Sequence, residues 1–497
     1  MFSVIKSLAK HSVIYGLGDL LSKSIGFILI PVYTHYLSTE EYGTLELLDL
    51  TSYIIGLLLA MGIAQSVVRY YYEYEDQKRK NQVISVAMLT IWAVCLFVLF
   101  VLFYFSDRIS TLVFNAPDYS HLFNIIFITM VINLSNEIPT TLLRIQQRSV
   151  FFVVISLARL VLNLTLNIVF IVHYGLGVLG ILYGGLIASA VTGVFLTVYT
   201  LRQTGLAYSL DIAKAMLKYG FPLVGSWLGM FVLNFGDRFL LQRLATLSDV
   251  GIYSLAYKFG MLPNVLILAP FSRIWAPKQF EIVKEPDALP TYGLVFTYFI
   301  YIQLFVGLGI LVLIRDILII IADPEYHSAY QYVILILISY IFYGAYSFTQ
   351  FGILLKKKTK YLGITALIGA VLNIVLNLLL IPPFKIWGAA IATICSFAFL
   401  LICVFPIAQH FYRIPYELGR LVKMVLTAAG LYVIALYINP TNIYSSITVK
   451  FVIALCFPVV LYLIGFYHRE EREKARELKA RVCNILKRKP KPPASER

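Results

Sequence analysis

The chain has 497 residues, of which 60% are hydrophobic and 13% are charged, and its mean hydropathy is +0.81. A soluble domain carries about twice that share of charged residues, so the composition excludes a soluble protein and predicts a polytopic membrane protein. The extended apolar runs match membrane helices, not the alternating strands of an outer-membrane barrel. The first apolar run lacks a small-residue cleavage site, so no cleavable signal peptide is expected.

The net charge of +15 comes from 41 Lys and Arg residues against 26 Asp and Glu residues. Most of the basic residues fall in alternate loops and in the C-terminal tail. Those assigned to the opposite side are Arg108, Arg243, Arg315, Lys385 and Lys450. Cytoplasmic loops are enriched in Lys and Arg in this way. The pattern predicts cytoplasmic termini and contact with anionic membrane lipid, with no nucleic acid partner.

Hydropathy predicts an all-α fold with about 14 transmembrane helices. Their expected spans are 12–36, 42–68, 82–105, 121–143, 150–172, 177–201, 219–242, 250–274, 290–314, 328–354, 361–381, 386–408, 418–438 and 447–467. The expected domains are an N-terminal six-helix lobe at 1–201, a cytoplasmic linker at 202–218, a C-terminal six-helix lobe at 219–410, helices 13 and 14 within 411–467, and a charged cytoplasmic tail at 468–497.

Acidic residues recur within the first helices. Asp19 and Lys23 are four residues apart in the first helix, so they either neutralise each other or face a watery cavity. Glu46 and Asp49 lie one turn apart in the second helix, on a face that continues through Tyr53, Gly56 and Ala60. Glu137 follows in helix four.

Neighbouring carboxylates repel, so one of them takes up a proton or attracts a cation. The candidates for coupling transport to a proton or sodium ion are therefore Glu46, Asp49, Glu137 and Asp19. The alternative for Glu46 and Asp49 is that they form an acidic vestibule at the outer side of the membrane. No other cofactor is expected. The five cysteines and seven histidines show no metal-binding spacing, so no metal site is expected either.

Two stretches, 143–171 and 353–381, resemble each other. Each opens with basic residues and continues through about 20 mostly apolar ones. The copies agree at Val161/Val371, Leu162/Leu372, Asn163/Asn373, Leu166/Leu376, Asn167/Asn377 and Ile171/Ile381. Repeated spans of like orientation predict two similar, pseudo-symmetric bundles around a central space. The alternative is that apolar runs look alike by chance.

Four cations from both lobes are candidates to line that space, namely Lys23, Arg159, Arg238 and Lys258. Together they predict a wet, positive cavity that binds a phosphate-bearing head group. Arg159 has no basic counterpart in the second repeat, which favours a functional role. The alternative for Arg238 and Lys258 is extension of their side chains to the membrane surface.

Tyr257 and Asn163 are two further substrate-binding candidates. Tyr257 precedes Lys258 and either stacks on a sugar face or anchors the chain at the interface. Asn163 lies on the same face of helix five as Arg159. Because both repeats carry the asparagine, a scaffold role in joining neighbouring helices is its alternative.

Two segments carry a resemblance to a known family. The first is HSVIYGLGDLLSKSIGFILIPVYTHYLSTEEYGTLELLDL, with Tyr15-Gly16, Pro31, Tyr36-Leu37-Ser38 and Glu41-Tyr42-Gly43. The second is RFLLQRLATLSDVGIYSLAYKFG, with Leu247-Ser248, Gly251, Tyr253 and Lys258. In order and spacing, these residues resemble the Wzx-type polysaccharide-biosynthesis flippases of the multidrug/oligosaccharidyl-lipid/polysaccharide exporter superfamily.

That resemblance implies two six-helix lobes, a V-shaped cavity and alternating access in the bacterial plasma membrane. It implies a substrate of undecaprenyl-diphosphate-linked oligosaccharide, moved to the outer leaflet for surface polysaccharide assembly such as lipopolysaccharide O-antigen. Polysaccharide polymerase and glycosyltransferases are the implied partners. Lys23 and Lys258 look like positions where such flippases often place a cavity cation.

Two other functions compete with this interpretation. A multidrug or cation antiporter of the same fold would favour an acidic, aromatic cavity. A membrane glycosyltransferase or polymerase acting on the same lipid-linked glycan would need a sizeable outer loop, and the predicted outer linkers are short. The chain shows no Walker motif, no HExxH and no nucleophile elbow. We therefore expect a transporter and not an enzyme.

Overall fold

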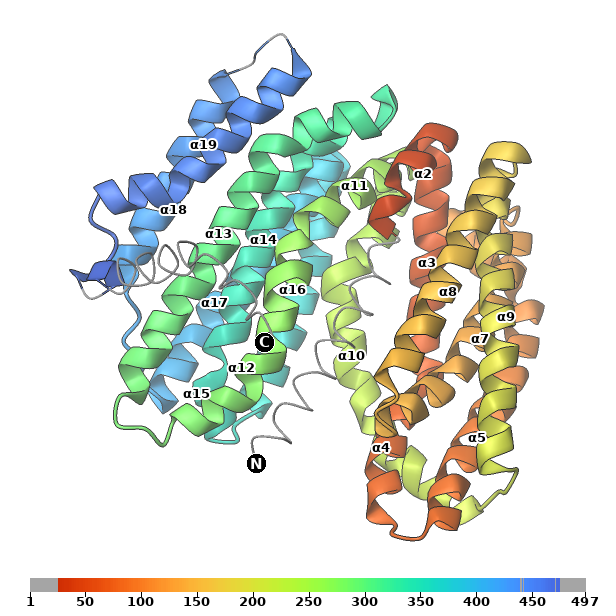
Figure 1. Cartoon of the computed structure of the whole chain (residues 1–497). Helices are drawn as coiled ribbons and strands as arrows, with labels where there is room; N and C mark the ends of the chain where they lie inside the picture. Colours follow the sequence, from red (N-terminus) through yellow and green to blue (C-terminus); the bar gives the residue numbers. More distant parts are fainter. Residues whose placement is uncertain (1–25, 439, 441, 470, 474–497) are drawn as a thin grey trace, which may run out of the picture. The chain divides into compact units, whose positions relative to one another are not determined.

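The computed structural model describes residues 26–438, 440, 442–469 and 471–473 (Figure 1). Every regular element in these ranges is helical. The predicted first span, 12–36, lies mostly outside them, and α2 (Ile30–Tyr36) forms its end. Asp19, Lys23 and most of the predicted tail also lie outside the described residues.

Twelve helices of the described part are long and apolar enough to cross a membrane. They cover Thr39–Glu73, Gln77–Tyr104, Ser120–Ile145, Ser149–His173, Gly177–Thr204, Leu247–Ile282, Ala288–Ile321, Pro324–Leu355, Lys360–Phe384, Ile386–Phe411, Leu418–Tyr437 and Ile443–Leu463. Each contains or closely matches one predicted span, which confirms the all-α, multi-pass class. The predicted span 219–242 lies in α10 (Leu210–Leu244), which is helical but is not one of these twelve.

The chain divides into two compact units. The first combines Met1–Glu281 with Ile317–Arg413, and the second combines Ile282–Asp316 with Ile414–Arg497. All of the predicted site residues that the structure describes belong to the first unit.

The first part of this unit is a bundle of helices that run alongside one another (orange to yellow in Figure 1). Its elements are α3 (Thr39–Ala60), α4 (Ile63–Glu73), α5 (Gln77–Tyr104), α6 (Ser106–Phe114), α7 (Ser120–Ile145), α8 (Ser149–Ile168), the π-helical turn η1 (Val169–His173) and α9 (Gly177–Thr204). Helix α7 contacts α3, α5, α8 and α9 and is therefore central. Its buried Ile138 and Leu142 join Val83 and Ala87 of α5 in the apolar core.

The second part of the unit begins with the long helix α10. It continues through α11 (Leu247–Gly260), the π-helical turn η2 (Asn264–Leu268), α12 (Ala269–Ile282), η3 (Pro324–Ala329), α14 (Tyr330–Thr349), α15 (Phe351–Leu355), α16 (Lys360–Phe384) and α17 (Ile386–Phe411). Helix α17 packs against both α14 and α16. Phe397, Leu400 and Val404 of α17 form a core with Tyr346 and Ile353.

Helices α3 and α11 join the two parts at very close range. Ser38 and Glu41 form a capping box that starts α3, so the first backbone N–H groups of that helix are satisfied. A Cβ atom on Gly43 would lie 2.2 Å from the carbonyl oxygen of Leu247, and one on Gly251 would lie 2.0 Å from that of Thr39. Only glycine fits at these two positions, because the backbones touch there.

The second unit contains most of α13 (Ala288–Ile321) together with α18 (Leu418–Tyr437) and α19 (Ile443–Leu463). Lys450 of α19 forms a buried ion pair with Asp316, Nζ to Oδ2 at 2.8 Å, and the Ser446 hydroxyl donates to the same carboxylate oxygen. A charge inside a membrane helix is costly unless it is paired. This pair therefore explains how α13 and α19 tolerate charged residues.

Just before α18, Glu417 accepts hydrogen bonds from Thr297 and Arg420 and also contacts the ring of His468. Burial alone would raise the pKa of Glu417, but these hydrogen bonds and the Arg420 charge outweigh it and lower that pKa. The carboxylate therefore stays ionised where the chain enters α18.

We expect Gly43→Ala to destabilise the protein by about 1–3 kcal/mol, because the new methyl group overlaps backbone atoms of α11. Gly185→Ala in α9 is the control, since a Cβ there meets nothing within 4 Å. Alanine is favoured over glycine in helices by up to about 1 kcal/mol, so the control should be neutral or stabilising. Thermal unfolding of the purified variants in detergent measures both, and equal shifts would contradict the close contact.

Candidate functional site

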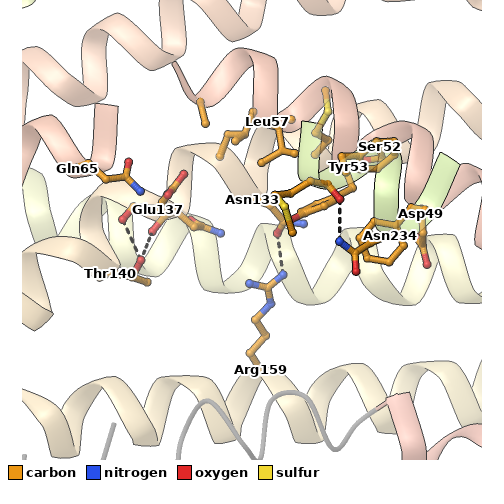
Figure 2. Close-up of a pocket in the computed structure, with 18 of the residues that line it drawn as sticks. Asp49, Ser52, Tyr53, Leu57, Gln65, Asn133, Glu137, Thr140, Arg159 and Asn234 are labelled. Atoms are coloured by element: carbon orange, nitrogen blue, oxygen red, sulfur yellow. Dashed lines mark hydrogen bonds between the residues drawn. The ribbon is translucent and has the colours of Figure 1, made fainter. Parts of the chain in front are cut away.

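A cavity of about 940 Å³ lies within the first unit. Its walls come from α3, α4, α7 and α8 on one part of the chain and from α10, η2 and α14 on the other. The volume falls within the usual range for a small-molecule site. Figure 2 shows polar side chains from several of these helices directed into the space.

The polar face predicted for the second helix lines this cavity. Asp49, Tyr53, Gly56 and Ala60 of α3 all belong to the wall, as the three- and four-residue spacing predicts. Asp49 and Tyr53 are exposed to the cavity, while Gly56 is buried against Met130. Glu46, one turn earlier, is half-buried and is absent from the cavity wall as described.

Helix α7 supplies the opposite polar wall through Asn133, Asn136, Glu137 and Thr140. Thr140 donates its hydroxyl to the carbonyl oxygens of Asn136 and Glu137, at 3.0 and 2.9 Å. These bonds lie beside Pro139, where the helix lacks a backbone donor. The Glu137 carboxylate faces the cavity from this segment (Figure 2).

Arg159 of α8 reaches into the same space. Its Nη2 atom donates to Asn133 Oδ1 at 2.7 Å (Figure 2). The same atom donates to Ser189 Oγ at 3.0 Å. Both partners are neutral, so the guanidinium keeps its full charge together with donors for an anion. Among the cavity-lining residues that the structure describes, Arg159 is the single cation beside two carboxylates, Asp49 and Glu137.

Asn163 lies about one turn after Arg159 in α8 and forms a hydrogen bond within the helix. It accepts from Asn167 Nδ2 at 2.7 Å, and Asn167 also donates to the Tyr33 hydroxyl. The second repeat has the same arrangement, because Asn377 Nδ2 donates to Asn373 Oδ1 at 3.0 Å. The Asn-x3-Asn spacing thus produces one local amide bond in both copies.

Arg238 is buried in α10 and does not line the described cavity. Its Nη1 atom lies 2.7 Å from Asp237 Oδ1, and each side chain is 1% exposed. The guanidinium carbon sits 3.7 Å from the centre of the Tyr257 ring, a cation–π contact. Tyr253 and Thr393 donate to the other Asp237 oxygen, at 2.6 and 3.2 Å. This network therefore connects α10, α11 and α17.

Lys258 of α11 points towards α3. Its Nζ atom donates to the Tyr42 hydroxyl at 2.6 Å and lies 4.8 Å from the centre of that ring. Glu46 and Asp49 interact electrostatically with Lys258. Within the described structure, the predicted acidic pair is thus balanced by a lysine from another helix.

The four predicted cavity cations therefore have different locations. Arg159 lines the cavity, Arg238 and Lys258 lie in packed contacts beside it, and Lys23 is outside the described residues. The ring of Tyr257 packs against the Arg238 guanidinium, and its hydroxyl accepts a hydrogen bond from Tyr340. Asp49 and Glu137 are the predicted coupling residues that line the cavity.

The cavity also contains side chains that sequence reasoning did not select as site residues. They are the amides Gln65, Asn133, Asn136, Asn234 and Asn264 and the aromatic residues Phe231, Phe235 and Tyr343. The spacing of Asn133, Asn136, Glu137 and Thr140 in helix four was the available signal. Amides exchange hydrogen bonds with hydroxyl groups, and aromatic rings offer flat apolar faces. Such a wall suits a polyhydroxylated ligand.

The described residues contain no group of three or more His, Cys, Asp or Glu side chains placed to hold a metal ion. The chemistry that the cavity offers is hydrogen bonding, charge pairing at Arg159 and stacking.

We expect Arg238→Met to lower the free energy of unfolding by about 3–5 kcal/mol, because it leaves Asp237 buried without its counter-charge. Arg159→Met is the matched control and should cost roughly 1 kcal/mol, since its partners are neutral and the cavity is open. The double variant Asp237→Asn/Arg238→Met should recover part of the loss. Chemical denaturation of the three proteins tests this, and equal effects of the two single variants would contradict it.

Comparisons with known proteins identify the family of the chain. Residues 8–283, more than half of the chain, match the family model described as "Polysaccharide biosynthesis protein". The chain is 20% identical over 265 residues to the succinoglycan biosynthesis transport protein ExoT of Rhizobium meliloti (strain 1021), covering 52% of this chain. The match spans about half (51%) of that relative's length.

Solved structures define the fold. The lipid II flippase MurJ, in an inward closed conformation, matches 92% of this chain and 100% of its own, with a TM-score of 0.73 and 14% identity. An inward-facing multidrug resistance MATE transporter of the MOP superfamily matches 78% of this chain and 94% of its own, with a TM-score of 0.64 and 15% identity. The chain therefore belongs to the polysaccharide biosynthesis protein family and has a MurJ- and MATE-like fold.

Proposed function

We propose that the protein is a flippase that moves a polyprenyl-diphosphate-linked oligosaccharide across the bacterial plasma membrane by alternating access. The observation that carries the proposal is Arg159, the single cationic group among the described residues of a cavity that is rich in amides and aromatic rings. The match to the polysaccharide biosynthesis protein family, and the similarity to a succinoglycan biosynthesis transport protein, support a glycan as part of the substrate.

Arg159 is proposed to meet the diphosphate. Guanidinium groups bind phosphate through paired N–H donors, and charge-assisted hydrogen bonds are roughly twice as strong as neutral ones. Asn133 and Ser189 hold the guanidinium in position without neutralising it. The diphosphate of the head group would therefore bind at one defined position, the Arg159 guanidinium.

The remaining wall is proposed to hold the sugars. Amides such as Gln65 and Asn234 exchange hydrogen bonds with hydroxyl groups, while Tyr53 and Phe235 offer faces for the apolar side of a sugar ring. Sugars cross the membrane interior only where polar groups replace water. The polyprenyl tail stays in lipid, and the two six-helix lobes open alternately to either side with the termini in the cytoplasm.

We expect Arg159→Glu to reduce translocation of a polyprenyl-diphosphate oligosaccharide about 10- to 100-fold. A hydrogen bond to a charged group contributes about 1.5–3 kcal/mol, and the reversed charge adds repulsion. Proteoliposomes with the labelled lipid in one leaflet, and a membrane-impermeant reagent that detects its appearance in the other, measure the rate.

Lys356→Gln is the control, because this exposed lysine lies after α15 and away from the cavity wall. Its rate should equal that of the unmodified protein. The added Lys23→Glu substitution should deepen the loss if Lys23 shares the role. Normal translocation by Arg159→Glu, in protein that inserts and unfolds normally, would refute the role of this arginine.

Ion coupling is proposed at the two carboxylates that line the cavity. Asp49 interacts electrostatically with Lys258, so a cation or proton arriving there would compete with the lysine charge. We expect Asp49→Asn to remove the response of the transport rate to an imposed proton or sodium gradient while downhill equilibration continues. Flux measurements with each gradient in turn test this, with Glu137→Gln in parallel; an unchanged response in both variants would exclude the cavity carboxylates.

A multidrug antiporter is the second candidate, and one observation favours it. The carboxylates Asp49 and Glu137 share the cavity with Tyr53, Phe231 and Phe235, a combination that also suits an organic cation. The Arg159→Glu variant separates the two functions. Reversing the charge at position 159 should lower the affinity for an anionic head group and raise the affinity for an organic cation such as ethidium. Faster ethidium flux together with unaffected glycan transport would therefore favour the antiporter.

A further inference from the structure

A second binding surface lies on α9, apart from the central cavity. It is a groove of about 1080 Å³, and its apolar lining consists of Ala190, Val191, Val194, Phe195 and Val198. Val191, Val194, Phe195 and Val198 are exposed. None of these residues lines the central cavity.

The groove has a polar end. Arg148, Tyr199, Arg202 and Gln203 surround it, and Arg148 donates a hydrogen bond to the Tyr199 hydroxyl. A smaller hollow of about 400 Å³ continues around Arg148 to Gln147 and Ser149. The apolar length and the polar end therefore form one continuous amphipathic surface.

The two arginines have no acidic partner among the described residues. Both are exposed, and Arg148 lies at the start of α8 while Arg202 lies in the last turn of α9. The tyrosine bond and the cation–π contact fix Arg148 at the groove's end. The site thus presents two guanidinium groups where both helices leave the membrane.

We propose that this groove binds one anionic phospholipid of the leaflet at its arginine-rich end. The phosphate accepts hydrogen bonds from Arg148 and Arg202, and an acyl chain lies along Val191, Val194 and Phe195. By the distribution of basic residues this leaflet is cytoplasmic, where anionic lipids attract Lys and Arg. The site does not depend on the substrate proposed for the central cavity.

The occupant follows from charge and shape. A membrane-spanning helix meets hydrocarbon along its whole apolar face, so the apolar part alone selects no ligand. Two unpaired guanidinium groups at one end select a phosphate with a net negative charge over a zwitterionic head group. A soluble phosphate would use the arginines but not the groove, so the acyl chain distinguishes it from a lipid.

The test measures lipid binding to the purified full-length chain in phosphatidylcholine nanodiscs that contain an increasing fraction of phosphatidylglycerol. Native mass spectrometry detects the bound lipid, and the shift of the unfolding temperature reports its effect on stability. Arg148→Gln/Arg202→Gln should weaken phosphatidylglycerol binding about 30-fold, since each basic residue near a membrane surface contributes about 1 kcal/mol. Val194→Trp, which fills the groove and keeps both arginines, should also weaken it.

Lys357→Gln/Lys358→Gln is the matched control, because it removes the same charge from the basic cluster of the second repeat. It should leave the affinity within twofold. Equal losses in the two double variants would reduce the effect to overall charge and overturn the site. Full binding in the Val194→Trp variant, or competition by glycerophosphate that lacks acyl chains, would overturn the lipid assignment.

Discussion

The charges buried between helices decide what the cavity can bind. Arg238 and Asp237 form an ion pair in which both side chains are 1% exposed, and Tyr253 donates to the free carboxylate oxygen. Removing one partner of such a pair leaves an uncompensated charge in a medium that solvates it poorly. The pair therefore holds α10, α11 and α17 in one arrangement. It also withdraws Arg238 from ligand binding, because the guanidinium is buried and its charge is paired with Asp237.

The same argument separates Lys258 from Arg159. Lys258 has a tyrosine at 2.6 Å and two nearby carboxylates, so an incoming phosphate would have to displace existing interactions. Arg159 meets only an amide and a hydroxyl and borders open space. A ligand gains most where the protein has left a charge without a counter-charge. Among the described cations, the position of Arg159 in the network, more than the number of cations, is why we propose it as the anion-binding group.

Much of this follows from the sequence, and the remainder depends on partners that periodicity does not identify. Hydropathy predicted the twelve described spans because crossing a bilayer requires a long apolar run, and helical spacing predicted that Asp49 and Tyr53 share a face. Spacing defines a face but not what lies opposite. Lys258 donates to Tyr42, and Lys450 pairs with Asp316, although the partners are far apart in the sequence. The predicted cavity cations Lys258 and Arg238 are held in contacts of this kind. Asn133 and Ser189, which hold Arg159, were not predicted because both are uncharged and their sequence positions show no pattern that links them to Arg159.

The contact between α3 and α11 bears on the opening that we propose for this protein. The backbones meet at Gly43 and Gly251, and Thr39 and Ser248 share a hydroxyl hydrogen bond at 2.8 Å. Tyr326 closes the same region by donating to the carbonyl oxygens of Leu37 and Ser38. Hydroxyl bonds have a net strength of about 1 kcal/mol each because water replaces them. Lys258 of α11 also donates to Tyr42 of α3 at 2.6 Å. In the alternating access proposed above, the cost of separating these two helices would therefore combine weak hydroxyl bonds with this one charged contact.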